Sequence, residues 1–430
     1  MPITETLSIL NLQKACGWIK SNLAYLLITA TLFLFISKSL YNFPIGIMAL
    51  IGLFRLIRYP KQYWQDPAVR IYILLFLCLW LPLLISLVDA VNPTRSAQTV
   101  FSYLRFLFMG IYVIPELRSR EMLDRLNTTI FCIVAFWCVD AAIQFVFKVD
   151  LFGHPYNGHY ITGIFYPEIT IGHVTAVLSP LYFDSIMTHS KKHKWVWILL
   201  IPLFLVILLS TRRAAWIMLF ISVVGYLFFL LKINHYDKTL IKWLGIIGAG
   251  LLLMVGLVIA SDSALQKRLQ VTSGLFSGNY ELAEKATGQR FALWHTSINI
   301  FRANWINGVG PRGYRYIYQQ YSDPDNFWYE AGQTHPHQLY LEVLAETGII
   351  GFLGLLLCVF LIYRFIKHYQ FFLPLYPYLL AVVVAIFPLN THMAFYGSYW
   401  SSIFWWLMLL VFANASCKLV ENRRTASSAL

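Results

Sequence analysis

Long apolar runs recur along the whole chain, and they constrain its fold more than any other feature. A bilayer core takes about 20 apolar residues in a helix, and a backbone in hydrocarbon must satisfy its own hydrogen bonds. We therefore expect an all-α, polytopic membrane protein with about 12 transmembrane helices. The expected spans lie near residues 22–38, 42–57, 71–91, 97–115, 126–147, 167–188, 195–210, 214–231, 243–260, 346–363, 371–389 and 400–416.

The composition agrees with a membrane protein. Charged residues make up 12% of the 430 residues, whereas soluble domains carry about 25%. A soluble enzyme, a disordered chain and a disulfide-stapled secreted domain are therefore excluded. The six cysteines nearly all lie in or beside apolar runs, which argues against a disulfide framework or a cysteine-based metal site. No small-residue cleavage site follows the first run, so we expect that run to be retained as the first span.

The distribution of lysine and arginine predicts the orientation. Most of the 33 basic residues fall in inner segments if the N-terminus is cytoplasmic, as the positive-inside rule requires. Both termini are then cytoplasmic, and the net charge of +13 reflects topology instead of a nucleic-acid partner. We expect three parts: helices 1–9 over residues 1–260, a long periplasmic loop over 261–336, and helices 10–12 with a cytoplasmic tail over 337–430.

The long loop is expected to contain structure of its own, because loops of this length are uncommon unless they are functional. Residues 289–303 have the pattern of an amphipathic helix, and residues 308–313 the pattern of a turn.

A histidine pair directly precedes the apolar helix that follows the loop, in the segment Thr334-His335-Pro336-His337-Gln338. If this helix includes His337, a rotation of about 100° per residue places Gly348 and Gly351 on the same face, where glycines let another helix approach closely. The helix dipole favours a neutral imidazole there, able to accept a proton. The alternative is that both histidines only cap the helix or line its polar entrance.

Three arginines on the predicted outer face are candidates for binding an anion. Arg212 and Arg213 separate two spans, and Arg290 opens the amphipathic helix of the loop. Forked guanidinium donors match the oxygens of phosphate, and a helix N-terminus adds to such a site. The alternatives are a snorkelling pair and a surface charge.

Other candidates point in different directions. Asp323-Pro324-Asp325 looks like the metal-holding pair of nucleotide-sugar transferases, although we favour an ordinary turn. Asp140, Asp184 and Arg105 fall within predicted spans. Intramembrane charges are functional by default, so these three keep a secondary transporter open as an alternative.

Three motifs resemble the bacterial O-antigen ligase family and its relatives, the O-antigen polymerases and the protein O-oligosaccharyltransferases. The most specific is His337-Gln338, nine residues, Gly348, two residues and Gly351. Arg290 with Trp294 and the later Gly308-Val309-Gly310 is similar to the family's arginine-bearing loop segment. Thr211-Arg212-Arg213-Ala214-Ala215-Trp216 is similar to its Ser/Thr-Arg turn, and either arginine fits the single arginine of the family. Where ligases often have an acidic residue in the last outer turn, this chain has Asn390 and His392.

The resemblance implies an O-antigen ligase in the bacterial inner membrane, with its active site facing the periplasm. Such an enzyme moves a glycan from undecaprenyl diphosphate to a hydroxyl of the lipid A–core oligosaccharide, with inversion, without a metal and without a cofactor. It also implies His337 as the general base, Arg290, Arg212 and Arg213 as the groups that bind the diphosphate, and Gln338, His335 and Trp294 as substrate-binding residues. A polymerase or a protein O-oligosaccharyltransferase would share most of this chemistry and differ in the acceptor.

Overall fold

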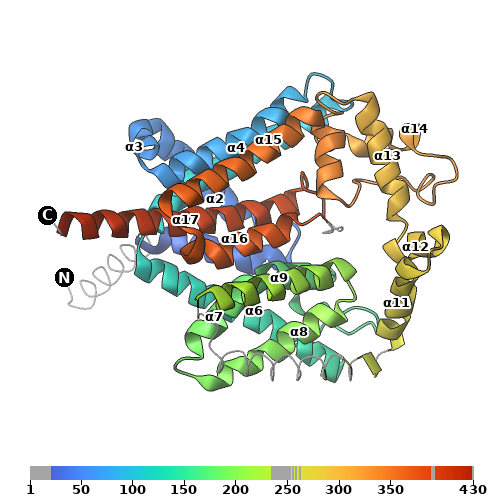
Figure 1. The fold of residues 1–430 in the computed structure, drawn as a ribbon, viewed down its shortest axis with the longest axis horizontal. Coiled ribbons are helices and arrows are strands. Elements are labelled where there is room, and N and C mark those ends of the chain that lie inside the picture. The colour runs from blue at the N-terminus through green and yellow to red at the C-terminus, as the bar shows by residue number, and fades with distance from the viewer. Residues whose placement is uncertain are drawn as a thin grey trace, which may run out of the picture.

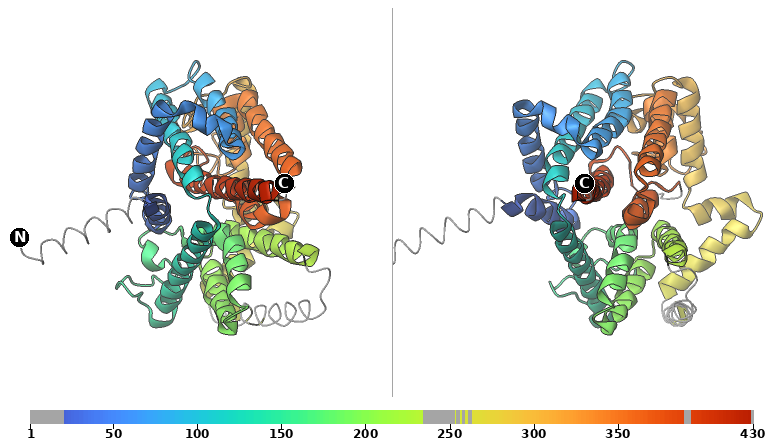
Figure 2. Two further views of the ribbon diagram at one scale, coloured as in Figure 1. Left: turned by 90° about the vertical axis from the view of Figure 1, so that its left-hand side faces the viewer. Right: turned by 60° about the vertical axis from the view of Figure 1, so that its left-hand side comes forward.

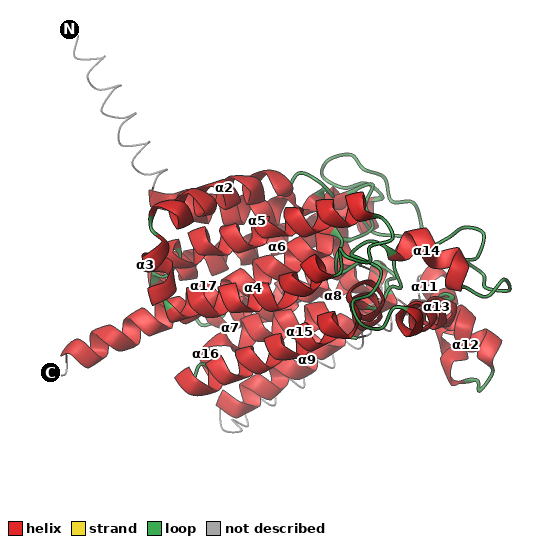
Figure 3. Ribbon diagram, turned by 90° about the horizontal axis from the view of Figure 1, so that it is seen from above, coloured by secondary structure: helices red, strands yellow, loops and turns green. Residues whose placement is uncertain are grey.

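The computed structural model describes residues 21–233, 253, 256, 259–260, 263–388 and 393–428. Within these ranges every regular element is a helix, and the only strand-like feature is an isolated bridge between Val149 and Pro155. The expected all-α fold is therefore confirmed (Figure 3).

The first described helix covers Ser21–Ile36 and ends in η1(Leu34–Ile36). The further elements are α2(Asn42–Arg58), α3(Pro60–Gln65), α4(Pro67–Ile85), α5(Pro93–Glu116), α6(Arg120–Phe147), η2(Gly163–Phe165), α7(Ile171–His189), η3(Lys194–Leu199), α8(Leu200–Leu209), α9(Arg213–Ile233), α11(Ser263–Ser273), η4(Gly274–Phe276), α12(Tyr280–Thr287), α13(Arg290–Ala303), α14(Tyr314–Tyr321), α15(Leu339–Tyr369), α16(Phe372–Ile386) and α17(Ser398–Ser428).

Many of the helices are suited to cross a membrane. Six of them in the described ranges, α4, α5, α6, α9, α15 and α17, are long and apolar enough, and three shorter apolar helices accompany them. The expected span at 243–260 lies outside the described residues apart from positions 253, 256, 259 and 260. The number of twelve spans stays a prediction.

The helices run side by side around α17 (Figure 2). In α17, 89% of the apolar window is buried within the protein. Trp405 of α17 contacts Tyr72 and Phe76 of α4 and Phe106 of α5, with ring centroids 5.4–6.1 Å apart. Large aromatic side chains bury much area and prefer offset or edge contacts, so these rings fix the position of α17 in the core.

The helices of the long loop gather at one end of the bundle. Figure 1 shows α11, α12, α13 and α14 at this end, which we call the loop end, whereas α3 and the last turns of α17 lie at the opposite end. The expected loop helix at 289–303 is confirmed as α13, which begins at Arg290. The expected turn at 308–313 is confirmed by the hydrogen bond from the Gly313 N–H to the Gly310 carbonyl, 2.9 Å.

The helix that follows the loop begins after His337, although the argument from the sequence had counted the helix from that residue. His337 has a φ of 53° and lies in the turn before α15, which begins at Leu339. The rotation counted from His337 along a continuous helix was therefore wrong. Gly348 has a φ of 63° and a ψ of −162°, which breaks the helix at that residue. His337 consequently does not share a helical face with Gly348 and Gly351.

At the break at Gly348, α15 packs against an irregular segment of the loop and not against another helix. The N–H groups of Ile349 and Ile350 donate to the carbonyls of Trp305 and Ile306 at 2.8 and 3.2 Å. A Cβ on Gly348 would lie 2.2 Å from the Ile306 oxygen. Gly348 allows a close approach, as expected of a glycine, but the partner is loop backbone, and the expected helix packing at this glycine was wrong.

Candidate functional site

Three arginines converge at the loop end. Arg212 and Arg213 stand where α8 gives way to α9, and Arg290 is the first residue of α13. Burial, together with the smaller effects of the Arg213 and Arg212 charges, lowers the pKa of Arg290 to about 10. A Cβ built on Gly288 would lie 3.4 Å from Nη2 of Arg213, so Arg213 reaches the turn before α13. We call Arg212, Arg213 and Arg290 the first arginine cluster.

The break between α8 and α9 explains how the two neighbouring arginines are presented. The Ser210 N–H still bonds the Val206 carbonyl at 2.9 Å, but Thr211 adopts a φ of 52°. Left-handed backbone ends a helix, and α9 starts at Arg213. The indole N–H of Trp216 donates to the carbonyls of Ile207 and Leu208, at 3.1 and 3.2 Å. Trp216 thus fastens the start of α9 to the end of α8.

Two residues beside the cluster were not found from the sequence. The Arg212 guanidinium lies 4.9 Å from the ring centroid of Tyr160, a cation–π contact. His173, in α7, is completely buried and interacts electrostatically with Arg212 and Arg290. His173 falls inside an apolar run and Tyr160 in a connection, so only the folded arrangement brings them to the arginines.

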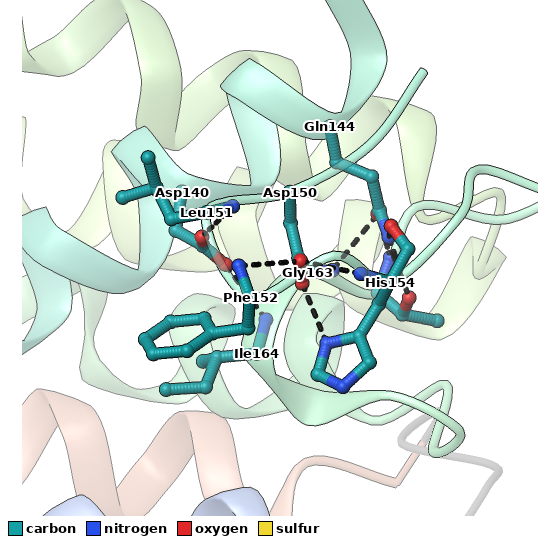
Figure 4. A network of polar contacts seen from close by, with 9 residues as sticks. Asp140, Gln144, Asp150, Leu151, Phe152, His154, Gly163 and Ile164 are labelled. Atoms are coloured by element: carbon teal, nitrogen blue, oxygen red, sulfur yellow. Dashed lines mark hydrogen bonds and ion pairs between the residues drawn. The ribbon is translucent and has the colours of Figure 1, made fainter. Parts of the chain in front are cut away.

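The connection that carries Tyr160 is held in place by polar side chains of α6 (Figure 4). Asp140 accepts from the N–H groups of Leu151 and Ile164, at 3.0 and 2.7 Å. Gln144 accepts from the N–H groups of Thr162 and Gly163, at 2.8 and 2.9 Å. Asp150 accepts from the N–H and the ring of His154, each at 2.8 Å. These bonds give residues 148–170 a fixed path over the loop end.

The other intramembrane charges also have partners within the fold. Tyr226 donates to Asp184 at 3.1 Å. Nη2 of Arg105 donates to the Ser398 hydroxyl at 2.8 Å, and the guanidinium lies 4.7 Å from the Phe106 ring centroid. Asp140, Asp184 and Arg105 thus each contribute to packing, which is a structural reason for charges in these helices.

The N-terminus of α13 is already occupied. The Glu284 carboxylate accepts from the N–H groups of Phe291 and Ala292, at 3.0 and 3.1 Å, and from the Thr287 hydroxyl at 3.2 Å. The expectation that this helix end adds an anion site was therefore wrong, because a carboxylate of the chain takes its N–H groups. The Arg290 side chain is what α13 contributes to the first arginine cluster.

The motif histidines form a pair of their own. The rings of His335 and His337 lie 4.1 Å apart between centroids, and Nδ1 of His335 lies 2.9 Å from the Thr334 hydroxyl. Gln338 is the N-cap of α15, where its side chain accepts from the Leu341 N–H at 2.5 Å. The cap of this helix is therefore Gln338, so the expectation that the histidines cap it was wrong, whereas the alternative that they line its polar entrance stays open.

The packing of α13 against α15 connects the helix that begins with Arg290 to the helix that follows the histidine motif. Leu293 of α13 and Ala345 of α15 belong to one buried cluster at the loop end, with Trp294 packed against it. The Trp294 ring also contacts Phe291, with centroids 5.5 Å apart. The expected substrate residue Trp294 therefore has a packing role within the loop.

The Asp323-Pro324-Asp325 segment forms the favoured turn, because the Asn326 N–H donates to the Asp323 carbonyl at 2.9 Å. The Asp323 carboxylate lies 3.0 Å from Nδ1 of His295. Asn390 and His392 lie outside the described residues.

A cavity of about 500 Å³ opens beside the first arginine cluster. Its lining includes Tyr160, which lies under Arg212, together with Gly158, Thr211, Ser263 and Lys267. Clustered guanidinium groups next to a polar, aromatic-lined space suit a ligand that combines an anion with a polar ring, since arginine binds phosphate oxygens with paired donors and flat rings pack on sugars.

Comparison with known proteins identifies a family for the middle of the chain. The profile of a family described as O-antigen ligase matches residues 198–356. This range contains the first arginine cluster, both motif histidines, Gly348 and Gly351. The resemblance seen in the motifs is thereby confirmed.

A curated relative comes from Haemophilus influenzae and carries the description "Uncharacterized protein". It is 28% identical over 164 residues, which represent 37% of this chain and 40% of that protein. The chain thus spans less than half the length of the relative that it matches.

Proposed function

We propose that this protein is an O-antigen ligase, because residues 198–356 match the family described as O-antigen ligase. It would move a glycan from undecaprenyl diphosphate to a hydroxyl of the lipid A–core oligosaccharide, at the periplasmic face of the bacterial inner membrane. The observation that carries this proposal is the convergence of Arg212, Arg213 and Arg290 at the loop end, beside a cavity lined by Tyr160.

The first arginine cluster would bind the diphosphate of the donor. Burial, and to a smaller extent the charges of Arg213 and Arg212, lower the pKa of Arg290, so a bound dianion would stabilise a cation that the free protein disfavours. As the glycosyl bond breaks, negative charge grows on the leaving diphosphate. Preorganised donors aimed at developing charge stabilise a transition state, and arginines do so without a metal.

His337 would act as the general base. The acceptor oxygen forms a bond with the anomeric carbon while the bond from that carbon to the diphosphate oxygen breaks, and the hydroxyl proton passes to the imidazole of His337. A single displacement inverts the anomeric centre. The positive φ of His337 supports this role, because left-handed backbone at a non-glycine residue is uncommon and strained residues cluster at functional sites.

Two acceptors other than lipid A–core fit the same residues. A polymerase would use a second lipid-linked glycan, and a protein O-oligosaccharyltransferase a serine or threonine. A secondary transporter, the alternative from another class, is disfavoured because Asp140, Asp184 and Arg105 have bonding partners within the fold.

A genetic experiment tests the proposal. A strain lacking the gene is complemented with the wild type, His337→Ala or Arg290→Ala, with membrane expression checked for each. We expect the lipopolysaccharide ladder to disappear in the null strain and both variants, while full-length glycan accumulates on undecaprenyl diphosphate. A single-repeat band on the core would indicate a polymerase instead. An unchanged ladder in every strain would contradict both assignments and favour the transporter.

A further inference from the structure

A second group of arginines lies at the loop end, away from the first arginine cluster. Arg312 and Arg315 belong to the turn before α14 and to its first residues, and Arg95 to the first turn of α5. Their charges act on one another: the pKa of Arg315 is lowered by burial and then by Arg312, is raised in part by the carboxylate of Glu346, and is lowered less by Arg95. We call Arg95, Arg312 and Arg315 the second arginine cluster.

The turn that carries Arg312 is docked on the first turn of α5 and on the connection that precedes it. The Ser96 hydroxyl donates to the Pro311 carbonyl and the Val91 N–H to the Val309 carbonyl, each at 3.0 Å. The Asn307 amide donates to Asp89 at 2.8 Å. Two segments that are far apart in sequence therefore present their arginines from one rigid surface.

Glu346 of α15 fixes the backbone of Arg312. Its carboxylate accepts from the Arg312 N–H at 2.7 Å and from the Tyr314 N–H at 3.4 Å. Arg312 has a φ of 65°, and strain of this kind persists where the surroundings over-determine it. Glu346 is completely buried, and its bonds to backbone N–H groups make it a positioning residue for Arg312.

The guanidinium groups of this cluster have buried nitrogens that lack a partner. Among the described residues, Nη1 of Arg312 and Nε of Arg315 are buried and make no hydrogen bond. Buried polar groups are almost always paired, so each exception needs an explanation, and a bound ion is one. Glu342 and Glu346 act on these arginines with opposite charge, whereas the unused guanidinium donors match the oxygens of an oxyanion.

The second arginine cluster is electrically separate from the first. Within the described part of the chain, the charges that act on Arg290 are those of Arg213 and Arg212. Leu293 of α13 and Tyr314 of α14 belong to one buried cluster at the loop end, and the Tyr314 hydroxyl donates to the Leu293 carbonyl at 3.2 Å.

We propose that the second arginine cluster binds an oxyanion of the acceptor, either a phosphate or a carboxylate on its core sugars. This inference rests on the proposed ligase function, because it needs an acceptor that is itself anionic. A lipid A–core acceptor carries such groups on sugars near its membrane anchor. Binding at Arg312 and Arg315 would hold the acceptor at a group of arginines other than the cluster that binds the donor, and would select for charged core structures.

Direct binding to the purified full-length protein in detergent tests this site without requiring transfer. The probes are lipid A–core, the same lipid after phosphatase treatment, and the same lipid with its carboxylates amidated. The variants are Arg312→Gln and Arg315→Gln, with Arg302→Gln as the matched control, since Arg302 is an exposed arginine near the end of α13. Thermal melting checks that each variant is folded.

We expect the Kd for untreated lipid A–core to rise at least tenfold in Arg312→Gln and Arg315→Gln and to stay within twofold in Arg302→Gln. Removing the oxyanion that is recognised should weaken binding to the wild type by a similar factor and have little further effect in the two variants. If the phosphatase-treated lipid binds more weakly, the recognised group is a phosphate; if the amidated lipid binds more weakly, it is a carboxylate. If the wild type binds all three lipids equally, or if both variants bind like the wild type, the site is wrong. Absence of transfer by a wild type that shows charge-dependent binding would instead overturn the ligase function.

Discussion

At the scale of residues, the lowered pKa of Arg290 makes anion binding at the first arginine cluster depend on pH. Its pKa is lowered to about 10 by burial and by Arg213 and Arg212. For a base, the cation is the form lost as the pH rises through this value, and the cation is the form that binds an anion. Affinity for the lipid-linked diphosphate should therefore be constant near neutral pH and fall above pH about 10.

The substitution Arg290→Lys should lower the pH above which affinity for the donor falls. An amine has an ordinary pKa of about 10.4, and the same burial and neighbours would bring it to about 8. We expect the variant to bind the donor near neutral pH and to lose it between pH about 7 and 9, where the wild type is unchanged. Donor binding measured from pH 6 to 10.5 checks this. Arg302→Lys, at an exposed position of the same helix, is the control, and identical profiles for Arg290→Lys and the wild type would contradict the prediction.

At the scale of residues, the sequence predicts those that belong to a motif and misses those that only the fold brings near. The Arg212–Arg213 pair was found because cations are rare in the short outer turns, and Arg290 because it opens an amphipathic helix of the loop; the structure brings them together. Tyr160 and His173 carried no such signal, since a tyrosine in a connection and a histidine in an apolar run are common in packing. Glu346 and Glu342, which are completely buried, had no signal either, because their partners are backbone N–H groups far away in sequence.

At the scale of elements, Gly348 decides the shape of α15. Its φ and ψ of 63° and −162° are accessible essentially to glycine alone, and a Cβ would lie 2.2 Å from the Ile306 oxygen. Gly348→Ala should therefore destabilise the protein by about 1–3 kcal/mol or more. Thermal melting in detergent measures this effect. Gly46→Ala, where a Cβ meets nothing within 4 Å, is the matched control, and equal melting temperatures for the two variants would refute the role of the break.

The connection held by α6 gives a second prediction at this scale. Asp140→Leu removes the acceptor of the Leu151 and Ile164 N–H groups, and an orphaned buried donor costs about 1–3 kcal/mol. We expect faster amide hydrogen exchange in residues 150–165, with exchange in α15 unchanged, and a fall in donor affinity as Tyr160 loses its position. Unchanged exchange, together with full loss of activity, would indicate the functional charge that a transporter requires.

The sequence predicts helices better than it predicts their irregularities. The division between α8 and α9 and the start of α13 follow from local signals such as Ser210-Thr211 and Gly288-Gln289. The break inside α15 does not, since a glycine within an apolar run is compatible with a continuous helix, and the Trp305–Ile306 backbone that fills the break is contributed by a different part of the chain.

At the scale of the whole molecule, the predicted orientation in the membrane can be tested at the two ends of the bundle. Lys285 lies at the loop end and Lys61 in α3, at the opposite end, and both are exposed. In a background without the native cysteines, Lys285→Cys should react with a membrane-impermeant maleimide in spheroplasts. Lys61→Cys should react only after the membrane is permeabilised. The reverse pattern would place the first arginine cluster in the cytoplasm and exclude a periplasmic reaction.

The most direct test of the ligase mechanism uses the purified protein in lipid nanodiscs with a lipid-linked glycan, lipid A–core and EDTA. We predict that the wild type forms the glycan–lipid A–core product. His337→Ala should bind the donor with unchanged affinity but transfer it about 10²–10⁴ times more slowly, because the base is missing while the arginines remain. Transfer by His337→Ala at the wild-type rate would contradict the role of His337. A wild-type reaction that stops in EDTA and returns with a divalent ion would contradict transfer supported by arginines alone.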